Sequence, residues 1–244
     1  MTLLAGKRAA VTGGASGLGA AIARRFAAEG AGGAVLDLAG AAGEAPAEWA
    51  SVAVDVRDDD AVRDAFATLE PLDVVVAAAG IVPGWAETAQ IRMDEWDAVI
   101  DVNVRGVVST IKHALPVLRD GASIVVIGSI NSFRGDPHIA SYVASKHAVL
   151  GIVRSTALDL GRRGIRVNGL APGPIATEAL LTRMRTRERE RGIPVDQALA
   201  AAARQTALGR MATADEVAAA ALFLASELSS GVTSHLLPVD CGLR

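Results

Sequence analysis

The feature that most constrains the fold of this chain is a regular alternation of short, continuously apolar runs with longer segments of helical periodicity. A strand that is apolar at every position must be covered on both faces of its sheet. Helices that alternate with such strands in βαβ order supply this cover. The pattern predicts an α/β fold, a Rossmann-type doubly wound sheet of about seven parallel strands. The expected strands are residues 8–13, 33–38, 51–56, 73–80, 122–129, 165–173 and 235–240.

Helices are expected near residues 18–29, 59–69, 94–119, 141–162 and 213–226. No linker interrupts the alternation, so residues 1–244 are predicted to form one domain. Residues 177–210 contain no expected strand and are predicted to be an insertion that contributes to a substrate site. Within it, residues 182–192 alternate arginines with other residues, including two glutamates. A solvated helical face with internal ion pairs is the favoured interpretation of this run, and an anion-binding lid is the alternative.

Charge and composition exclude several classes of partner. A net charge of −3 gives no general attraction to nucleic acid or to anionic membranes. The long apolar stretch at residues 217–225 is about half the roughly 20 residues of a membrane span. The single cysteine, Cys241, cannot form an internal disulfide, and the first residues lack the apolar region of a signal peptide. A cytoplasmic protein with a small-molecule partner is therefore predicted.

The sequence TGGASGLG, residues 12–19, joins the first expected strand to the first expected helix. Gly13 permits a sharp turn, Gly17 lets the backbone approach a pyrophosphate, and Gly19 lets the helix pack closely. Glycine also collects in tight turns for backbone reasons alone. Asp37 ends the second expected strand, where a dinucleotide-binding fold places the acid that binds the adenine ribose. A turn-capping aspartate is the alternative for this residue.

Two further features involve side chains that can carry chemistry. Asp55 ends the third expected strand and is expected either to cap the next helix or to contact adenine. The segment SYVASK contains the only tyrosine of the chain, Tyr142, and one of its three lysines, Lys146. Positions i and i+4 share one face of a helix, so the ring and the ammonium can reach the same site. A buried structural tyrosine with a solvated lysine is the alternative.

A simple electrostatic argument gives this pair a function. Free tyrosine has a pKa near 10, and a base that acts near neutral pH needs a value lower by roughly 2 to 3. An ammonium about 5 Å away, at an effective dielectric constant of about 20, favours the phenolate by roughly 3 kcal/mol. The lysine charge is thus of the required magnitude, and Tyr142 is predicted to be a proton-transfer group.

With these residues the sequence resembles the short-chain dehydrogenase/reductase family over essentially its whole length. The TGxxxGxG and YxxxK motifs of that family match residues 12–19 and 142–146. Its catalytic serine, thirteen residues before the tyrosine, falls on Ser129. Its helix asparagine, its PG motif and the threonine that meets the nicotinamide carboxamide fall on Asn103, Pro172, Gly173 and Thr177.

The chain departs from the family pattern at three places. It has AAAG at residues 77–80 where NNAG is usual, Thr233-Ser234 where TG is common, and DCG in place of DGG near its end. None of these changes affects a proton-transfer group. The alanines at 77 and 78 remove side-chain hydrogen bonds that would brace the central sheet. The adenine pocket is therefore expected to have less local support.

The resemblance implies an oxidoreductase that transfers hydride between a secondary alcohol, such as a cyclic alcohol, diol or sugar, and NAD, giving a ketone. Tyr142 would exchange the proton and Ser129 would hold the substrate oxygen. Lys146 would bind the nicotinamide ribose, and Asn103 would position a water of the proton relay. An NADPH-dependent ketone reductase and, less favoured, a non-catalytic nucleotide-binding scaffold are the alternatives. The expected catalytic residues are Asn103, Ser129, Tyr142 and Lys146.

Most of the expected cofactor contacts follow from the same resemblance. NAD is preferred to NADP because Asp37 would face the 2′-phosphate, and neither Ala15 nor residues 38–40 include a cation to offset the repulsion. The expected cofactor-binding residues are Gly13, Ser16, Gly17, Leu18, Gly19, Asp37, Leu38, Asp55, Val56, Ala78, Ala79, Gly80, Asn103, Tyr142, Lys146, Pro172, Gly173, Ile175 and Thr177.

Substrate, metal and assembly complete the expectations. The substrate pocket is expected between residues 81–85, residues 131–138 and the segment after Thr177. No metal site is expected, because His138 and His147 have no further ligand at metal spacing. The resemblance also implies a homotetramer that packs through the helices at 94–119 and 141–162.

Overall fold

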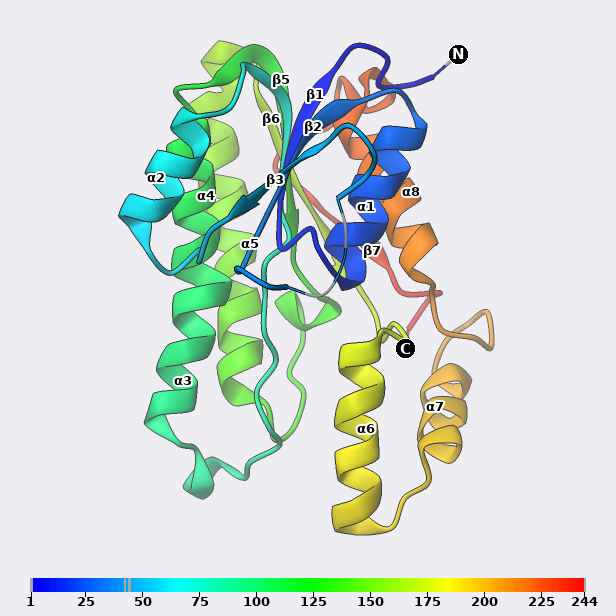
Figure 1. Ribbon diagram of the computed structural model, residues 1–244. Coiled ribbons are helices and arrows are strands. Elements are labelled where there is room, and N and C mark those ends of the chain that lie inside the picture. The colour runs from blue at the N-terminus through cyan, green and yellow to red at the C-terminus, as the bar shows by residue number, and fades with distance from the viewer. Residues whose placement is uncertain (1, 42, 44, 244) are drawn as a thin grey trace.

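Seven parallel strands form a single sheet in the order β3-β2-β1-β4-β5-β6-β7 in the computed structural model (Figure 1). The structure describes residues 2–41, 43 and 45–243, without the side chains of residues 179, 183, 187, 190 and 191. This sheet confirms the predicted doubly wound fold. The strands are β1 (Arg8–Thr12), β2 (Gly32–Asp37), β3 (Ala50–Ala53), β4 (Leu72–Ala77), β5 (Leu118–Ile127), β6 (Arg166–Pro172) and β7 (Leu236–Val239).

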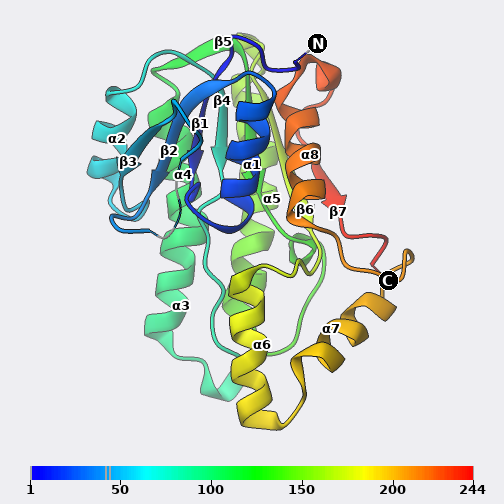
Figure 2. The same ribbon diagram turned by 45° about the vertical axis from the view of Figure 1, so that its right-hand side comes forward.

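Helices cover both faces of the sheet. One face carries α2 (Asp59–Ala67), α4 (Gly106–Ala114) and α5 (Ala140–Leu160), and the other carries α1 (Gly17–Ala28) and α8 (Ala214–Ala225), as Figures 1 and 2 show. Successive strand side chains point to opposite faces. In β4, Val75 therefore belongs to one apolar core, whereas Val74 and Val76 belong to the other. The central strands are apolar at successive positions because their alternate side chains fill two cores.

One expected helix is wrong in extent. In place of a helix over 94–119 the chain forms α3 (Met93–Ile100), a π-helical turn (Asp101–Arg105) and then α4, and β5 begins at Leu118. Leu118 pairs with Leu72, ahead of an irregularity in the β4–β5 register. Residues 119–121 are exposed and polar. The start of β5 therefore has no apolar run to reveal it in the sequence.

The expected insertion at 177–210 contains no strand outside isolated bridges, and two helices occupy it. These are α6 (Glu178–Arg191) and α7 (Val195–Arg204), which extend beyond the sheet in both views (Figures 1 and 2). Arg185 and Glu178 form an exposed ion pair at 2.6 Å, of the kind that a solvated helical face requires. The side chains of Arg183, Arg187 and Arg191 lie outside the described part of the chain, so the lid alternative stays open.

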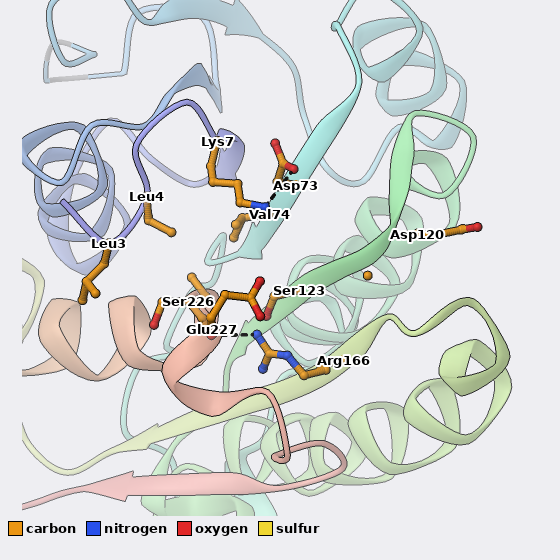
Figure 3. A pocket seen from close by; sticks show the side chains of 12 residues that line it. Leu3, Leu4, Lys7, Asp73, Val74, Asp120, Ser123, Arg166, Ser226 and Glu227 are labelled. Carbon is orange, nitrogen blue, oxygen red and sulfur yellow. Dashed lines mark hydrogen bonds and ion pairs between the residues drawn. The ribbon is translucent and has the colours of Figure 1, made fainter. Parts of the chain in front are cut away.

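A small pocket lies at the amino-terminal ends of β4, β5 and β6, with a volume of about 40 Å³ (Figure 3). Its two cationic side chains have partners within the fold. Lys7 pairs with Asp73 at 3.5 Å, and the Arg166 guanidinium donates to the carbonyl oxygens of Leu224 and Ser226 at 2.9 and 3.1 Å. Arg166 thereby ties the start of β6 to the end of α8. The residues that line this pocket thus hold elements of the fold together. The pocket lies at the opposite edge of the sheet from the glycine loop.

No helix in the described part of the chain is long and apolar enough to cross a membrane.

Candidate active site

The candidate site lies at the carboxyl ends of the strands, next to β1 and β4, where the order of the strands in the sheet reverses. β1 has β2 on one side and β4 on the other, and the chain continues from β1 and from β4 into helices on opposite faces of the sheet (Figure 1). Ligands of doubly wound folds bind in the crevice at such a switch point. Because all seven strands are parallel, the segments that follow them meet at this same edge. These segments carry the predicted residues Gly13–Gly19, Ala78–Gly80, Ser129 and Pro172–Thr177.

Three glycines of the loop after β1 have separate structural reasons. Gly13 has a φ of +66°, and a Cβ at this position would lie 2.6 Å from Ala79 Cα. A Cβ on Gly19 would lie 2.1 Å from the Gly13 carbonyl oxygen. Gly17 has a φ of +53° and has nothing within 4 Å of its Cβ position. The first two glycines thus allow close packing of the loop, and the third faces open space, as an approaching pyrophosphate requires.

The amino terminus of α1 has the features of an anion-binding site. Ser16 holds the N-cap position with an extended backbone and makes no side-chain cap hydrogen bond, and the first turn has no acidic residue. The first N–H groups of a helix lack intrahelical partners and carry the positive end of its dipole. Leu18 lies in this first turn. A phosphate group suits such a helix terminus.

Asp37 lies at the end of β2 beside the glycine loop. Its carboxylate accepts hydrogen bonds from the backbone N–H groups of Ala15 at 2.9 Å and of Leu38 at 2.8 Å. The two oxygens are thus held in place by the backbone, and each keeps lone pairs for a further donor. Asp37 braces the loop as a turn-capping residue does, and it also has the acceptors that ribose hydroxyls need.

Asp55 does not cap the helix that follows it, so that part of its prediction is wrong. Asp58 is the N-cap of α2 and accepts a hydrogen bond from the Ala61 N–H at 3.0 Å. Asp55 instead pairs with Arg57, whose Nη2 lies 2.6 Å from the carboxylate, and this hydrogen bonding lowers the pKa of Asp55. Val56 is buried. An adenine contact of Asp55 and Val56 stays a prediction.

Tyr142 and Lys146 share one face of α5, as their spacing predicts. Lys146 Nζ lies 5.5 Å from the centroid of the Tyr142 ring and donates a hydrogen bond to the Ile127 carbonyl oxygen at 2.8 Å. The lysine side chain is buried, and burial lowers the pKa of Lys146 to about 8. The alternative of a solvated lysine is therefore excluded. At neutral pH the ammonium form still predominates.

Ser129 follows β5 at the same edge of the sheet. It caps a short 3₁₀ helix (Ile130–Ser132), and its Oγ accepts a hydrogen bond from the Asn131 N–H at 3.1 Å. Its own N–H donates to Ser132 Oγ at 3.3 Å. These two bonds form a capping box that fixes the direction of the Ser129 side chain.

Asn103 lies in the π-helical turn and is fully buried. Its Oδ1 accepts from the Ile81 N–H at 2.8 Å, and its Nδ2 donates to the Ile81 carbonyl oxygen at 2.9 Å and to Ser145 Oγ at 3.1 Å. π-helical turns are frequent at functional sites. Gly80 borders this network, because a Cβ there would lie 3.4 Å from Asn103 Oδ1 and 3.8 Å from Lys146 Nζ. Sequence reasoning missed Ser145, since nothing local distinguishes it from other helical serines.

The segment after β6 leads from the sheet to α6. Gly173 follows Pro172, and a Cβ there would lie 2.9 Å from Asp240 Cβ. Ile175 is buried and bridges to Ala212. Thr177 is the N-cap of α6, and its Oγ1 accepts a hydrogen bond from the Leu180 N–H at 3.4 Å. Contacts of these residues with nicotinamide stay predictions.

Potential metal ligands do not gather at the site. Across residues 2–41, 43 and 45–243, no group of three or more His, Cys, Asp or Glu side chains is placed to hold an ion. The site consists instead of backbone N–H groups, one fixed carboxylate, two hydroxyls, an amide and a buried amine.

The whole chain matches known proteins. Residues 13–244 match a family model described as enoyl-(acyl carrier protein) reductase. The chain is 37% identical over 249 residues to cis-4-hydroxycyclohexanecarboxylate dehydrogenase of Sinomonas cyclohexanicum, a match that covers 96% of this chain and 95% of the relative. It is 36% identical over 256 residues to gluconate 5-dehydrogenase of Gluconobacter oxydans strain 621H, with 98% and 95% covered.

Solved structures match equally well. The crystal structure of carveol dehydrogenase from Mycobacterium avium in complex with NAD is similar to this fold with a TM-score of 0.90, at 31% sequence identity and with 99% of each chain covered. The likeness therefore concerns the complete fold, including the edge of the sheet where the site lies.

Proposed function

The chain belongs to the short-chain dehydrogenase/reductase family, and we propose that it is an NAD-dependent dehydrogenase that oxidises cyclic secondary alcohols to ketones. It is an oxidoreductase of CH–OH groups that uses a nicotinamide cofactor. The observation that carries the proposal is the buried Lys146 beside Tyr142, at the same sheet edge as Ser129 and the glycine loop.

The residues present fit a nicotinamide dinucleotide. The open space at Gly17 and the uncapped terminus of α1 would hold the pyrophosphate, and Asp37 would accept hydrogen bonds from the adenine ribose. Lys146 would donate to the nicotinamide ribose. The bound cofactor would supply the hydride acceptor for oxidation and the hydride donor for reduction.

The protein's own residues would handle the proton. In oxidation, Ser129 Oγ holds the substrate oxygen while Tyr142 Oη accepts its proton, and reduction reverses this transfer. The Lys146 ammonium favours the phenolate over the phenol. For a separation equal to the 5.5 Å between Lys146 Nζ and the ring centroid, and an effective dielectric constant of about 20, one unit charge would contribute about 3 kcal/mol to this preference.

NAD is preferred to NADP in this proposal because Asp37 cannot easily move away from a 2′-phosphate. Backbone N–H groups of Ala15 and Leu38 hold its two oxygens. The adjacent residues 38–40 provide no cation. Two negative charges in one pocket would then repel each other without compensation.

A cyclic substrate is favoured by the loops that border the proton-transfer residues. Ile81, Val82 and Phe133 have exposed fractions between 37% and 45%, on the segments that follow β4 and Ser129. Exposed apolar side chains beside a polar site suit an apolar ring that carries a hydroxyl. The relative from Sinomonas cyclohexanicum, whose name specifies a hydroxycyclohexane carboxylate, supports the same class. The alternative, an NADPH-dependent ketone reductase, is favoured by the reductase description of the matching family model.

The test is a screen of the purified protein with NAD and NADP across cyclic secondary alcohols, open-chain polyols and the corresponding ketones. We expect NAD reduction with cyclic alcohols. Tyr142→Phe should retain nucleotide binding and lose nearly all turnover, because only the proton-transfer oxygen is removed. Turnover by Tyr142→Phe close to that of the unmodified enzyme would contradict the proposed mechanism, and nucleotide binding without any turnover in the screen would favour the scaffold alternative.

Domain organisation, assembly and location belong to the same proposal. Residues 1–244 act as one nucleotide-binding domain in which α6 and α7, within residues 177–210, form part of the substrate site. Four copies assemble through the helices near 94–119 and 141–162 in the cytoplasm. Support for the assembly comes from exposed apolar side chains on α4 and α5, which include Val108 and Leu158.

A further inference from the structure

Ser145 directly precedes Lys146 on α5, and no motif of the sequence assigns it a function. It is fully buried. Its hydroxyl donates a hydrogen bond to the Tyr142 carbonyl oxygen at 2.7 Å and accepts one from Asn103 Nδ2 at 3.1 Å. One side chain thus connects the helix of the proton-transfer residues to the π-helical turn.

The orientation of the Asn103 amide is determined by its partners. Ile81 offers both an N–H donor and a carbonyl acceptor, and these meet Oδ1 and Nδ2 respectively. Reversing the amide would place donor against donor and acceptor against acceptor. A side-chain amide has two N–H donors, and here Ile81 and Ser145 take both. A water held by Asn103 would therefore donate a hydrogen bond to an oxygen of this residue.

We propose that Ser145 is a positioning residue for the alcohol–ketone reaction, because its hydroxyl ties the Asn103 amide, which holds Ile81 and the loop after β4, to α5. This inference rests on the proposed dehydrogenase function. The loop that Ile81 begins also contacts α3 and the segment after Ser129, through Gly84 N–H to Glu95 Oε1 and Ala86 N–H to the His138 carbonyl oxygen. The Asn103 amide thus lies between Ser145 and a border of the substrate site.

The first experiment measures steady-state kinetics of Ser145→Ala. The change leaves one buried Asn103 N–H without its partner, so the amide keeps its two bonds to Ile81 and loses its bond to α5. We expect kcat to fall by about tenfold to a hundredfold, while KM for NAD changes by less than about threefold, because Lys146 keeps its bond to Ile127. Ser109→Ala is the matched control. Ser109 is another buried serine, on α4, whose hydroxyl donates to Asp59 at 2.8 Å.

A double-mutant cycle with Asn103→Ala separates an effect through Asn103 from an effect through α5. If Ser145 acts through Asn103, Ser145→Ala causes little further loss of kcat in the Asn103→Ala background. If the kcat losses of the two single variants multiply in the double variant, the proposal is overturned, since Ser145 would then act independently of the amide. If Ser145→Ala does not fold, Ser145→Cys replaces it in the cycle, because a thiol is only a weak donor and acceptor.

The second experiment needs no substrate. Amide hydrogen exchange of the ligand-free protein is followed over the loop after β4. Ser145→Ala should speed exchange of the Ile81 N–H about tenfold, and Ser109→Ala should leave it unchanged. Unchanged exchange at Ile81, or faster exchange with kcat unaltered, overturns the proposal. Absence of turnover by the unmodified protein would instead contradict the proposed function, while the exchange data still decide whether Ser145 holds Asn103.

Discussion

At the scale of single residues, the chemistry of the site depends on groups that the fold holds in unusual surroundings. Lys146 is an amine that is buried in the protein, and Asp37 is a carboxylate held by two backbone N–H groups. Each arrangement favours one charge state or one ligand, and each gives a measurable prediction.

Lys146 should make the stability of the ligand-free protein depend on alkaline pH. Its pKa is about 8 in the fold, against 10.5 for an unperturbed lysine, so between these values the unfolded chain binds more protons than the folded one. Stability should therefore rise as pH increases from about 8 to about 10.5, by up to about 3 kcal/mol relative to Lys146→Met. Urea unfolding of both proteins measures this difference.

The comparison is best made with Tyr142→Phe present in both proteins, so that the phenol does not titrate in the same range. Other groups then contribute equally and cancel. A difference in unfolding free energy that stays constant from pH 7 to pH 10.5 would show that the Lys146 ammonium is not destabilised by burial.

Asp37 should set the choice of nucleotide. We expect NAD to exceed NADP in kcat/KM by about a hundredfold or more, because like charges in one pocket can cost several kcal/mol. Asp37→Asn removes the charge and keeps an acceptor for the Ala15 N–H. It should therefore reduce the preference for NAD over NADP while the glycine loop stays in place. Asp37→Ala combined with Leu38→Arg should narrow it further or reverse it. Equal kcat/KM values in the unmodified enzyme would mean that another cation reaches the phosphate.

At the scale of secondary structure elements, loops that follow neighbouring strands are placed by close backbone contact. The loop after β1 lies against the loop after β4 at Gly13 and Ala79. The π-helical turn between α3 and α4 similarly places Asn103 against Ile81 and α5. The site is therefore assembled by contacts between elements more than by any one of them.

Gly13→Ala tests the contact between these loops. The new methyl would lie 2.6 Å from Ala79 Cα, so the glycine loop must shift. Gly6→Ala is a matched control, because Gly6 has a similar φ of +72° and nothing within 4 Å of its Cβ position. Both variants should lose about 1 kcal/mol of unfolding free energy, because each places an alanine in the left-handed region. Gly13→Ala should lose more than this and should also bind NAD at least about tenfold more weakly. Calorimetry and a nucleotide titration measure the two effects. If the two variants have equal stability and equal NAD affinity, the loops after β1 and β4 can move apart without affecting the site.

At the scale of the whole molecule, the outer faces of α4 and α5 carry apolar side chains with no cover in one chain. Leu158 is 80% exposed. We expect light scattering to give four times the chain mass of 24.9 kDa at micromolar concentration. Leu158→Glu should weaken this assembly, whereas Leu228→Glu, at a comparably exposed leucine beyond α8, should not. A monomer of the unmodified protein would reject the proposed tetramer.

Local patterns were sufficient to predict much of the fold and the placement of Lys146 beside Tyr142. Both sheet faces are covered, so the central strands contain runs of consecutive apolar residues, and their alternation with helices follows directly. Tyr142 and Lys146 share a face because α-helical geometry places i and i+4 together. The motif positions of the glycine loop and Ser129 likewise come to one edge, because parallel strands end on the same side.

By itself, then, the sequence determined what repeats at short range: the order of strands and helices, the glycine turn and the spacing of Tyr142 and Lys146. The tertiary structure alone decided the burial of Lys146, the approach of Gly13 to Ala79 and the bonds among Asn103, Ile81 and Ser145. It also placed the start of β5 at Leu118. The physical reason is that these features depend on contacts between residues far apart in the chain, such as the 42 positions between Asn103 and Ser145, which no local periodicity records.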